Sequence, residues 1–473
     1  MTTIDIALLR RFLLSGGGSD ATSELLSSVS LEDIILNLSN LGDECFPDPS
    51  DDVSSYSGPI NSTYPGTIFV RVLDEILDFP RLNALFGNPQ VLELLSQRLV
   101  TSSLPVRSLF AKKCRFYFSN GGTSNAHLMG LLWRLLFDTE YSIFEDVSIA
   151  LCFVLKHDVA ILTDSRLRDL DNALTLVDAD GIIPVRIFEF CALVGSGSCD
   201  AFRALLSFGL YGSMFKIFLH GDSLVMLNCL EILDRHSLLI QRLHDAGALP
   251  RDFIVRCLST ISPSSSDSGD KLVAPFSYKF LLSLNRYPGA LTSDDLSNFA
   301  SVVSDTIKRG DPNSVTGTYL SSVECFGPLY MSGHLDDSVY SKVLDIISLT
   351  SQEVVVKSVI YCLMSMFDLG VTDEYLPSFC NLTGSMIQCL SRFPLSDFRE
   401  LAYKLLLRSI RYTPVLRAIL DEELRSHLFS KEESLYSNTM AKKELVHRVI
   451  ELLDDTVSLP AERVAALRRY AGV

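Results

Sequence analysis

The feature that most constrains the fold is a helical period that starts and ends with glycine. From Gly209 to Gly247, a short apolar segment is followed by a turn with Asp222, a longer amphipathic segment and another short segment. The period is about 38 residues long, within the range of helical repeat proteins. A similar pattern restarts after Gly247, with apolar residues at Phe253 and Ile254. Because each unit leaves an apolar face that only its neighbours can bury, we expect an all-α solenoid of stacked helices.

Longer segments elsewhere carry the same amphipathic pattern, with apolar residues at i, i+4 and i+7, and no alternating strand pattern stands out. The triplets are Phe69/Leu73/Ile76, Val147/Leu151/Val154, Ile187/Cys191/Val194, Val225/Cys229/Ile232 and Val356/Ile360/Leu363. Ser30 and Asp222 each precede such a segment and offer an oxygen to the free amides of a first helical turn. The sequence therefore predicts helices with defined starts.

Three regions follow from the distribution of Pro, Gly and Ser. Residues 1–41 are predicted to be an N-terminal helical cap with a glycine-rich break at 16–18. Residues 42–65 carry four prolines, several acids and many serines, which predicts an exposed loop. Residues 66–473 are predicted to be one continuous repeat array, interrupted by a Ser-rich loop at 262–270.

Composition limits the partners and the compartment. The net charge is −16, with 57 acids against 41 Lys and Arg, which argues against nucleic-acid binding and favours a basic partner. The eleven cysteines are scattered singly, as in a reducing compartment. Arg10 and Arg11 interrupt the first apolar stretch, and no apolar run approaches the roughly 18 residues of a membrane span. We expect a monomer with no membrane contact, located in the cytoplasm with the nucleus as a second compartment.

Short motifs that resemble catalytic or metal sites lack the context that such sites need. Gly221-Asp222-Ser223-Leu224 spells a lipase and esterase nucleophile motif, but it lies at a predicted helix start and not after a strand. Asp267-Ser268-Gly269 spells half of an aspartic-protease site without a second copy. Asp178 to Gly181 resembles the start of a calcium loop, but Ile187 stands where the loop needs Glu. No catalytic residue, metal or cofactor is predicted, and the chain is expected not to be an enzyme.

The phase of the long helices identifies pairs of positions, one turn apart, that should face the concave side of a solenoid. These pairs are Phe153/His157, Leu193/Gly197, Glu231/Arg235, Tyr361/Ser365 and Leu407/Arg411. The candidate protein-binding residues chosen from this face are Phe153, His157, Glu189, Glu231, Arg235 and Tyr361. The alternative is that they are ordinary solvated or packed helix residues.

The segment from Gly209 to Pro250 resembles an armadillo repeat. Val225, Cys229, Leu230 and Leu233 fill its apolar positions, and Gly247-Ala248-Leu249-Pro250 matches its common turn. Nuclear-import receptors of this class carry Trp and Asn ladders in the groove. Glu231 and Arg235 occupy those positions here, and the single Trp lies elsewhere, which argues against an import receptor.

A closer resemblance, spread over nearly the whole chain, is to the 26S proteasome non-ATPase regulatory subunit 5 family. Two segments carry it most clearly, Pro184 to Glu189 and Ala441 to Val446. The resemblance implies an armadillo/HEAT-like α-solenoid that binds the C-terminal domain of one base-ring ATPase subunit during assembly. It implies release of this chaperone before the mature proteasome forms. The alternative is another armadillo/HEAT adaptor, for trafficking or the cytoskeleton, and the client's identity and the repeat number stay open.

Overall fold

The structure is a computed structural model of the whole chain. It describes residues 5–38, 41, 43–46, 64–175, 182–262, 268–313, 315–370, 393, 396–421, 440–456 and 461–471. Every regular element in these residues is an α-helix or a short 3-10 helix, and they contain no strand. The prediction of an all-α fold is confirmed.

Contacts divide the chain into two compact units. Unit 1 comprises Met1–Ile217 with Arg235–Arg242, and unit 2 comprises Phe218–Asp234 with Leu243–Val473. The division falls inside the glycine-bounded period from which the repeat was inferred. The single continuous array stays a prediction, and each unit is described separately.

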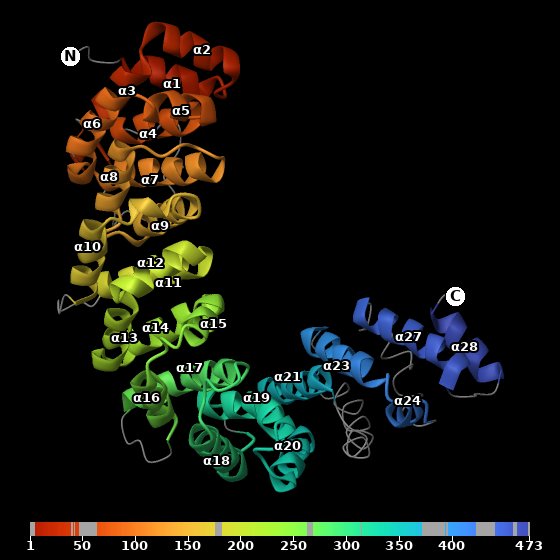
Figure 1. The fold of residues 1–473 in the computed structure, drawn as a ribbon. Helices are drawn as coiled ribbons and strands as arrows, with labels where there is room; N and C mark the ends of the chain where they lie inside the picture. Colours follow the sequence, from red (N-terminus) through yellow and green to blue (C-terminus); the bar gives the residue numbers. More distant parts are fainter. Residues whose placement is uncertain are drawn as a thin grey trace. The chain divides into compact units, whose positions relative to one another are not determined.

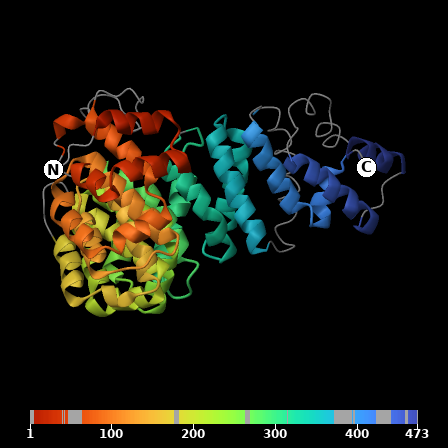
Figure 2. The ribbon, with the colours of Figure 1, turned by 90° about the horizontal axis from the view of Figure 1, so that it is seen from above.

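Unit 1 is built from two layers of helices. Its elements are α1 (Ile6–Leu14), α2 (Ser19–Ser28), α3 (Leu31–Leu38), η1 (Asp43–Cys45), α4 (Pro65–Ile76), α5 (Phe79–Phe86), α6 (Pro89–Arg98), η2 (Leu99–Thr101), α7 (Leu104–Ser119), α8 (Ala126–Leu135), α9 (Tyr141–Leu155), η3 (Val159–Ile161), α10 (Asp164–Thr175), α11 (Ile182–Gly197), α12 (Cys199–Phe208) and most of α13 (Leu210–His220). Helices α1, α4, α7, α9 and α11 pack in sequence, each against the next. Figure 1 shows α7 above α9, with α6, α8 and α10 along the left-hand side. From above, the red and orange helices overlie the yellow ones (Figure 2).

Unit 2 repeats this arrangement. Its elements are most of α14 (Ser223–Arg235), the end of α15 (Ser237–Asp245), α16 (Arg251–Ile261), α17 (Ser268–Leu284), α18 (Ser293–Arg309), α19 (Gly317–Met331), α20 (Asp337–Leu349), α21 (Glu353–Leu369), α23 (Ser396–Ser409), α24 (Thr413–Ile419), α27 (Met440–Thr456) and α28 (Ala461–Ala471). Helices α17, α19, α21, α23 and α27 pack in sequence, while α18 and α20 pack on each other and form a second layer. We call α4, α7, α9, α11, α14, α17, α19, α21, α23 and α27 the long helices. From α7 onward they begin roughly 40 residues apart, as expected of helical repeats.

The apolar triplets form the core, as their spacing predicts. Every member is buried except Val225, which is half-buried in the first turn of α14. Two cysteines, Cys191 and Cys229, belong to these triplets, and Cys362 is buried beside Leu363. Burial raises the pKa of the Cys191 and Cys362 thiols to about 12. These thiols are therefore protonated core residues at neutral pH.

Glycines and an aspartate set the ends of the repeat helices. Gly209 and Gly247 have φ values of 88° and 63°, the left-handed conformation that ends many helices. The Asp222 carboxylate accepts a hydrogen bond of 2.9 Å from the Val225 amide and caps α14. Ser223, the serine of the esterase-like motif, is therefore the first residue of a capped helix.

The predicted loops differ from the structure at their edges. Asp43–Cys45 forms η1 and Pro65 already belongs to α4, while residues 47–63 lie outside the described residues. The Ser-rich loop does not extend to 270, because α17 begins at Ser268 and Asp270 in its first turn is buried. Residues 263–267 and the predicted turn at 178–181 also lie outside the described residues.

In the part of the chain that the structure describes, no single helix combines the length and hydropathy of a membrane span. Helices α12 and α13 meet that test only together, as a pair bent by 72°.

Candidate protein-binding surface

Two of the predicted contact residues bind each other in unit 1. Arg235 Nη1 donates a hydrogen bond of 2.9 Å to Glu189 Oε1. The Arg235 side chain is 55% exposed, whereas that of Glu189 is 15% exposed. Glu189 is therefore held by Arg235, and Arg235 is the member of the pair that a partner can reach.

A tyrosine and an arginine that the sequence analysis missed complete this cluster. Tyr141, the first residue of α9, lies with its hydroxyl 3.5 Å from Glu189 Oε1. The Arg186 guanidinium lies 5.8 Å from the centre of the Tyr141 ring and donates to the Asp138 and Thr139 carbonyls. Burial, followed by the nearby Glu189 carboxylate, raises the pKa of Tyr141. The phenol is neutral at physiological pH and is 45% exposed.

The predicted pair Phe153 and His157 is only partly as expected. Phe153 lies half-buried in the last turn of α9, with Lys156 Nζ 5.3 Å from its ring centre. His157 is exposed, but α9 ends at Leu155, so His157 lies in the following turn. The prediction of a second helical groove position at His157 is wrong, because the helix stops two residues earlier.

In unit 2, the other two predicted residues lie on exposed helix faces. Glu231 is exposed on α14, on the same face as Leu224, which is 61% exposed. Tyr361 is 54% exposed on α21, two turns after Val354. Both side chains are placed so that a partner can reach them, and their role in binding stays a prediction.

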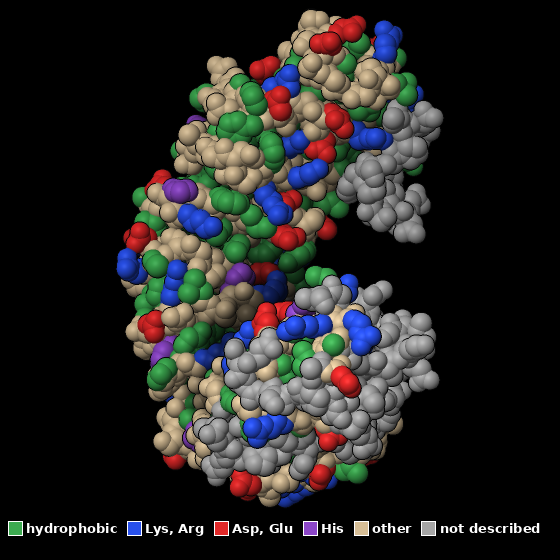
Figure 3. Space-filling view, turned by 90° about the vertical axis from the view of Figure 1, so that its right-hand side faces the viewer, with side chains coloured by type: hydrophobic (Ala, Val, Ile, Leu, Met, Phe, Trp, Pro, Cys, Tyr) green, Lys and Arg blue, Asp and Glu red, His purple; other side chains and the backbone are tan. Residues whose placement is uncertain are grey.

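Ion pairs join successive long helices in unit 1. Lys112 on α7 pairs with Asp74 on α4 at 2.8 Å, and Arg115 on α7 pairs with Asp146 on α9 at 2.9 Å. The Glu189–Arg235 pair links α11 in the same way to Arg235, the last residue of α14, which belongs to unit 1. The upper part of Figure 3, which holds the N-terminal helices, shows basic and acidic side chains intermixed. This face is suited to a partner with charges of both signs.

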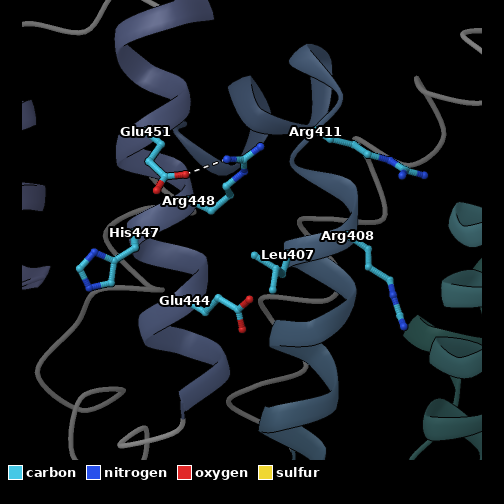
Figure 4. Close-up of a pocket in the computed structure, with 7 residues that line it drawn as sticks. All are labelled: Leu407, Arg408, Arg411, Glu444, His447, Arg448 and Glu451. Atoms are coloured by element: carbon cyan, nitrogen blue, oxygen red, sulfur yellow. Dashed lines mark hydrogen bonds and ion pairs between the residues drawn. The ribbon is translucent and has the colours of Figure 1, made fainter.

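A cleft of about 470 Å³ lies between α23 and α27 in unit 2 (Figure 4). It is lined by Leu407, Arg408, Arg411, Glu444, His447, Arg448 and Glu451. Arg448 pairs with Glu451 at 2.7 Å, and Arg408 pairs with Asp368 at 3.2 Å. Arg411 donates to the Phe367 carbonyl and points away from α27 in Figure 4. Two of the three arginines that line the cleft are therefore held by carboxylates of the chain itself.

In the described residues, the short motifs that resemble catalytic sequences lack the structural context that those catalytic sites need. The described residues hold no group of three or more His, Cys, Asp or Glu side chains placed to bind a metal ion. Ser223 and Ser268 each begin a helix, and Ser223 does not follow a strand. Asp267 lies outside the described residues.

No protein-family model and no curated protein sequence matches the chain. Among solved structures, an engineered protein from the Northeast Structural Genomics Consortium is 14% identical, with a TM-score of 0.43, over 96% of this chain and 100% of that one. Kap121p bound to Pho4p is 12% identical, with a TM-score of 0.47, over 98% of this chain and 46% of that one. Kap121p bound to Ste12p is 12% identical, with a TM-score of 0.48, over 96% of this chain and 50% of that one.

This chain therefore spans about half the length of the Kap121p chains that it resembles. The described helices stack in two layers within each unit, which makes the chain an all-α protein of the α-solenoid class.

Proposed function

We propose that the chain is an assembly chaperone of the 26S proteasome regulatory particle base. It binds the C-terminal domain of one base ATPase subunit through its long helices and leaves before the mature particle forms. The proposal is supported by the resemblance of Pro184 to Glu189 and Ala441 to Val446 to the regulatory subunit 5 family. These segments lie on α11 and α27. In this proposal the chain is a cytoplasmic monomer when free.

The observation that carries the proposal is the set of exposed long polar and aromatic side chains on three of the long helices, α9, α14 and α21. Tyr141 and Arg235 are about half exposed in unit 1, and Glu231 and Tyr361 are exposed in unit 2. Tyr and Arg side chains dominate the binding energy of many protein interfaces. Stacked helices present such groups over an extended surface, which suits a folded protein domain better than a small molecule.

The net charge of the chain indicates which kind of partner it attracts. With a net charge of −16, the chain attracts a basic domain over long range and speeds its association. Binding is therefore expected to weaken as salt is added, through a slower association rate. A client domain with a basic helical surface would satisfy this requirement.

The test is recovery of partners from a cell lysate on the purified chain. We expect free base ATPase subunits in the recovered fraction, and less of them on the Glu231→Lys variant. Asp345→Lys on α20 is the matched control, because it makes the same charge change at an exposed residue of the second layer. Recovery of a coat or motor protein without any base ATPase would favour the alternative, an armadillo/HEAT adaptor for trafficking or the cytoskeleton.

We also propose that the chain acts by binding alone. Ser223 begins α14 next to the capping Asp222, which gives its hydroxyl no strand-to-helix turn of the esterase kind. A hydrolase screen of the wild type and Ser223→Ala is expected to show no difference. Activity that disappears with this hydroxyl would contradict the proposal.

A further inference from the structure

Exposed apolar side chains recur at the N-terminal ends of the long helices of unit 2. Leu224 is the second residue of α14, Leu272 lies in the second turn of α17, Val315 precedes α19 by two residues, and Val354 is the second residue of α21. They are 61%, 48%, 46% and 49% exposed, respectively. Four successive long helices thus each have a large, exposed apolar side chain at or near their start. Exposed apolar side chains that recur in this way often mark an interaction site.

A shared arginine brings the first two helix ends together. Arg256 Nη2 on α16 lies 3.6 Å from Met226 Sδ on α14 and 3.1 Å from Asp270 Oδ1 on α17. Met226 follows Leu224 by two residues, and Asp270 precedes Leu272 by two. The N-terminal ends of α14 and α17 therefore adjoin the same guanidinium.

Direct contacts place the start of α19 beside the middle of α17, one turn after Leu272, and beside the start of α21. A Cβ added to Gly317, the first residue of α19, would lie 3.0 Å from Pro275 Cγ on α17. Before α21, Thr350 Oγ1 donates a bond of 2.8 Å to the Pro312 carbonyl, in the segment before α19. The Ser351 amide donates a bond of 3.2 Å to Asn313 Oδ1 in the same segment.

Helices α17, α19 and α21 also run in the same direction. Pro275 and Tyr278 on α17 lie against Gly317 and Cys325 on α19, in the same order. Ser358 Oγ on α21 lies 3.2 Å from Glu324 Oε1 on α19, and one turn later Gly327 approaches the Cys362 carbonyl. The paired positions advance together along both helices, as they do only in a parallel pair. Leu224, Leu272, Val315 and Val354 therefore lie along one edge of unit 2, and we call them the apolar strip.

We propose that the apolar strip docks an amphipathic helix of the partner protein, with Lys or Arg beside its apolar face. Packed helices lie about 8–10 Å apart, so the strip offers one apolar side chain at about that interval. On an α-helix, residues seven apart share a face and are separated by about 10.5 Å. A partner helix with an apolar residue at every seventh position thus meets one strip residue from each long helix. The inference rests on the proposed function, because it specifies the part of the client that the long helices hold.

The charges beside the strip select a basic helix. Asp222 and Asp311 are exposed near Leu224 and Val315, and Glu231 follows on the exposed face of α14. Lys271, exposed beside Leu272, is the one base next to a strip residue in the described residues, so the acids outnumber it. The other two acids near the strip already have partners in the chain: Asp270 pairs with Arg256, and Glu353 pairs with a lysine one turn later. The unpaired carboxylates favour Lys and Arg on the partner and disfavour an acidic segment.

The test uses a synthetic helical peptide of about five turns, with Leu at every seventh position and Lys on both flanks. Its binding to the full-length chain is measured by titration calorimetry. Leu272→Glu and Val354→Glu are each expected to weaken binding about tenfold or more, because a carboxylate replaces an apolar contact. Leu369→Glu is the matched control, since Leu369 is 61% exposed at the opposite end of α21. Its affinity is expected to match that of the wild type, and circular dichroism confirms that all variants are helical.

Equal affinity for the two strip variants and the wild type would overturn the proposal, as would an equal loss with Leu369→Glu. Tighter binding of a peptide with Glu in place of Lys would also overturn it. A wild-type dimer in sedimentation that Leu272→Glu dissociates would identify a second copy of the chain as the occupant instead. If the strip variants still recover base ATPases while Glu231→Lys does not, the strip fails and the chaperone proposal survives. If the peptide binds as expected and no base ATPase is recovered, the chaperone proposal fails and the strip survives.

Discussion

Because Gly195 on α11 has no side chain, Tyr211 and Leu239 pack closely against its backbone in unit 1. A Cβ at this position would overlap the Tyr211 hydroxyl and lie 3.0 Å from Leu239 Cδ1. Tyr211 is 1% exposed, and its hydroxyl has no hydrogen-bond partner in the structure as described. Burial raises the pKa of this phenol well above its ordinary value. The close packing therefore leaves a polar atom unsatisfied in the core.

This arrangement predicts coupled effects of two substitutions. Gly195→Ala is expected to lower the free energy of unfolding by about 1–3 kcal/mol, because the added methyl overpacks the core. Tyr211→Phe is expected to be neutral or to stabilise by up to about 1 kcal/mol, since it removes an unsatisfied hydroxyl. In the Tyr211→Phe background, Gly195→Ala should cost less. Urea denaturation of the four proteins measures this, and an equal cost in both backgrounds would contradict it.

At the residue scale, the sequence predicted which side chains are buried better than it predicted which side chains contact one another. The i, i+4, i+7 spacing correctly placed Ile187, Cys191 and Val194 in the core, because that spacing fixes one face of a helix. The same reasoning chose Glu189 and Arg235 but could not show that they pair. Their contact joins two helices from different repeats, so it depends on how those repeats stack.

Basic side chains from later helices satisfy the C-terminal carbonyls of earlier ones. Lys113 Nζ on α7 donates to the Asp74 and Leu77 carbonyls at the end of α4, at 2.6 and 3.2 Å. Arg242 donates to the Gly195 carbonyl at the end of α11, and Arg411 to the Phe367 carbonyl of α21. The last carbonyls of an α-helix have no i+4 amide within the helix, and they carry partial negative charge. The contacts therefore link neighbouring repeats as well as capping helices.

Lys113 and its neighbour Lys112 allow a test of how much the contacts with the α4 carbonyls contribute to stability. Lys113 is 8% exposed, whereas the side chain of Lys112 is 61% exposed, and both approach the Asp74 carboxylate. Lys113→Met is expected to lower the free energy of unfolding by about 1–3 kcal/mol, because buried carbonyls lose a charged donor. Lys112→Met should cost less than about 1 kcal/mol, as exposed ion pairs do. Thermal or chemical unfolding of both variants measures the difference, and equal costs would show that the carbonyl contacts add nothing.

Asp295 caps α18 and also joins it to α16. Its carboxylate accepts hydrogen bonds from the Thr292 amide and hydroxyl, at 2.9 and 2.7 Å, and from the Arg251 guanidinium. Burial opposes its ionisation, but the bonds from Arg251 and Thr292 outweigh burial and hold the pKa of Asp295 below its ordinary value. The folded state therefore prefers the ionised carboxylate.

That preference gives a pH dependence with a definite sign. Because the pKa is lower in the folded state, this contribution to stability is complete above the unfolded value of about 3.9. It is lost as the pH falls through the folded value. Asp295→Asn is expected to cost about 1–3 kcal/mol at neutral pH and progressively less below about pH 4. Denaturation of both proteins across this range checks the prediction, and a constant difference down to the lowest pH would contradict it.

Helix ends could be predicted where a capping residue or a glycine at that end of the helix determines them. Ser30 accepts a hydrogen bond of 3.1 Å from the Asp33 amide, Asp222 caps α14, and both glycine ends are left-handed as expected. The start of α17 was not predictable from its Ser-rich composition. Asp270 is held there by Arg256 on α16, a contact that composition does not reveal.

The whole chain is built from neighbour contacts, which predicts that its two units unfold separately. The only tryptophan, Trp133, is buried in unit 1, so its fluorescence reports on that unit alone. Phe326 is fully buried on α19 in unit 2. Phe326→Ala is expected to destabilise unit 2 by about 3–5 kcal/mol. In urea, the loss of helicity should begin earlier while the Trp133 transition stays in place. An equal shift of both transitions would show that the units unfold together.

At this scale the sequence predicted the solenoid class but not the division into units. The repeated amphipathic segments predicted stacked helices, and the glycine-bounded period predicted the repeat length. The division depends on how densely contacts are distributed, and it falls within that same period. No local feature of Gly209 to Gly247 distinguishes a boundary from an ordinary repeat.

Hydrogen–deuterium exchange of the chain, with and without the C-terminal domain of each base ATPase, tests the central claim that the long helices bind the client. We expect one ATPase domain to slow exchange in α14, α17, α19 and α21 while leaving α18 and α20 unchanged. Protection confined to α18 and α20, or no protection with any of these domains, would contradict the account.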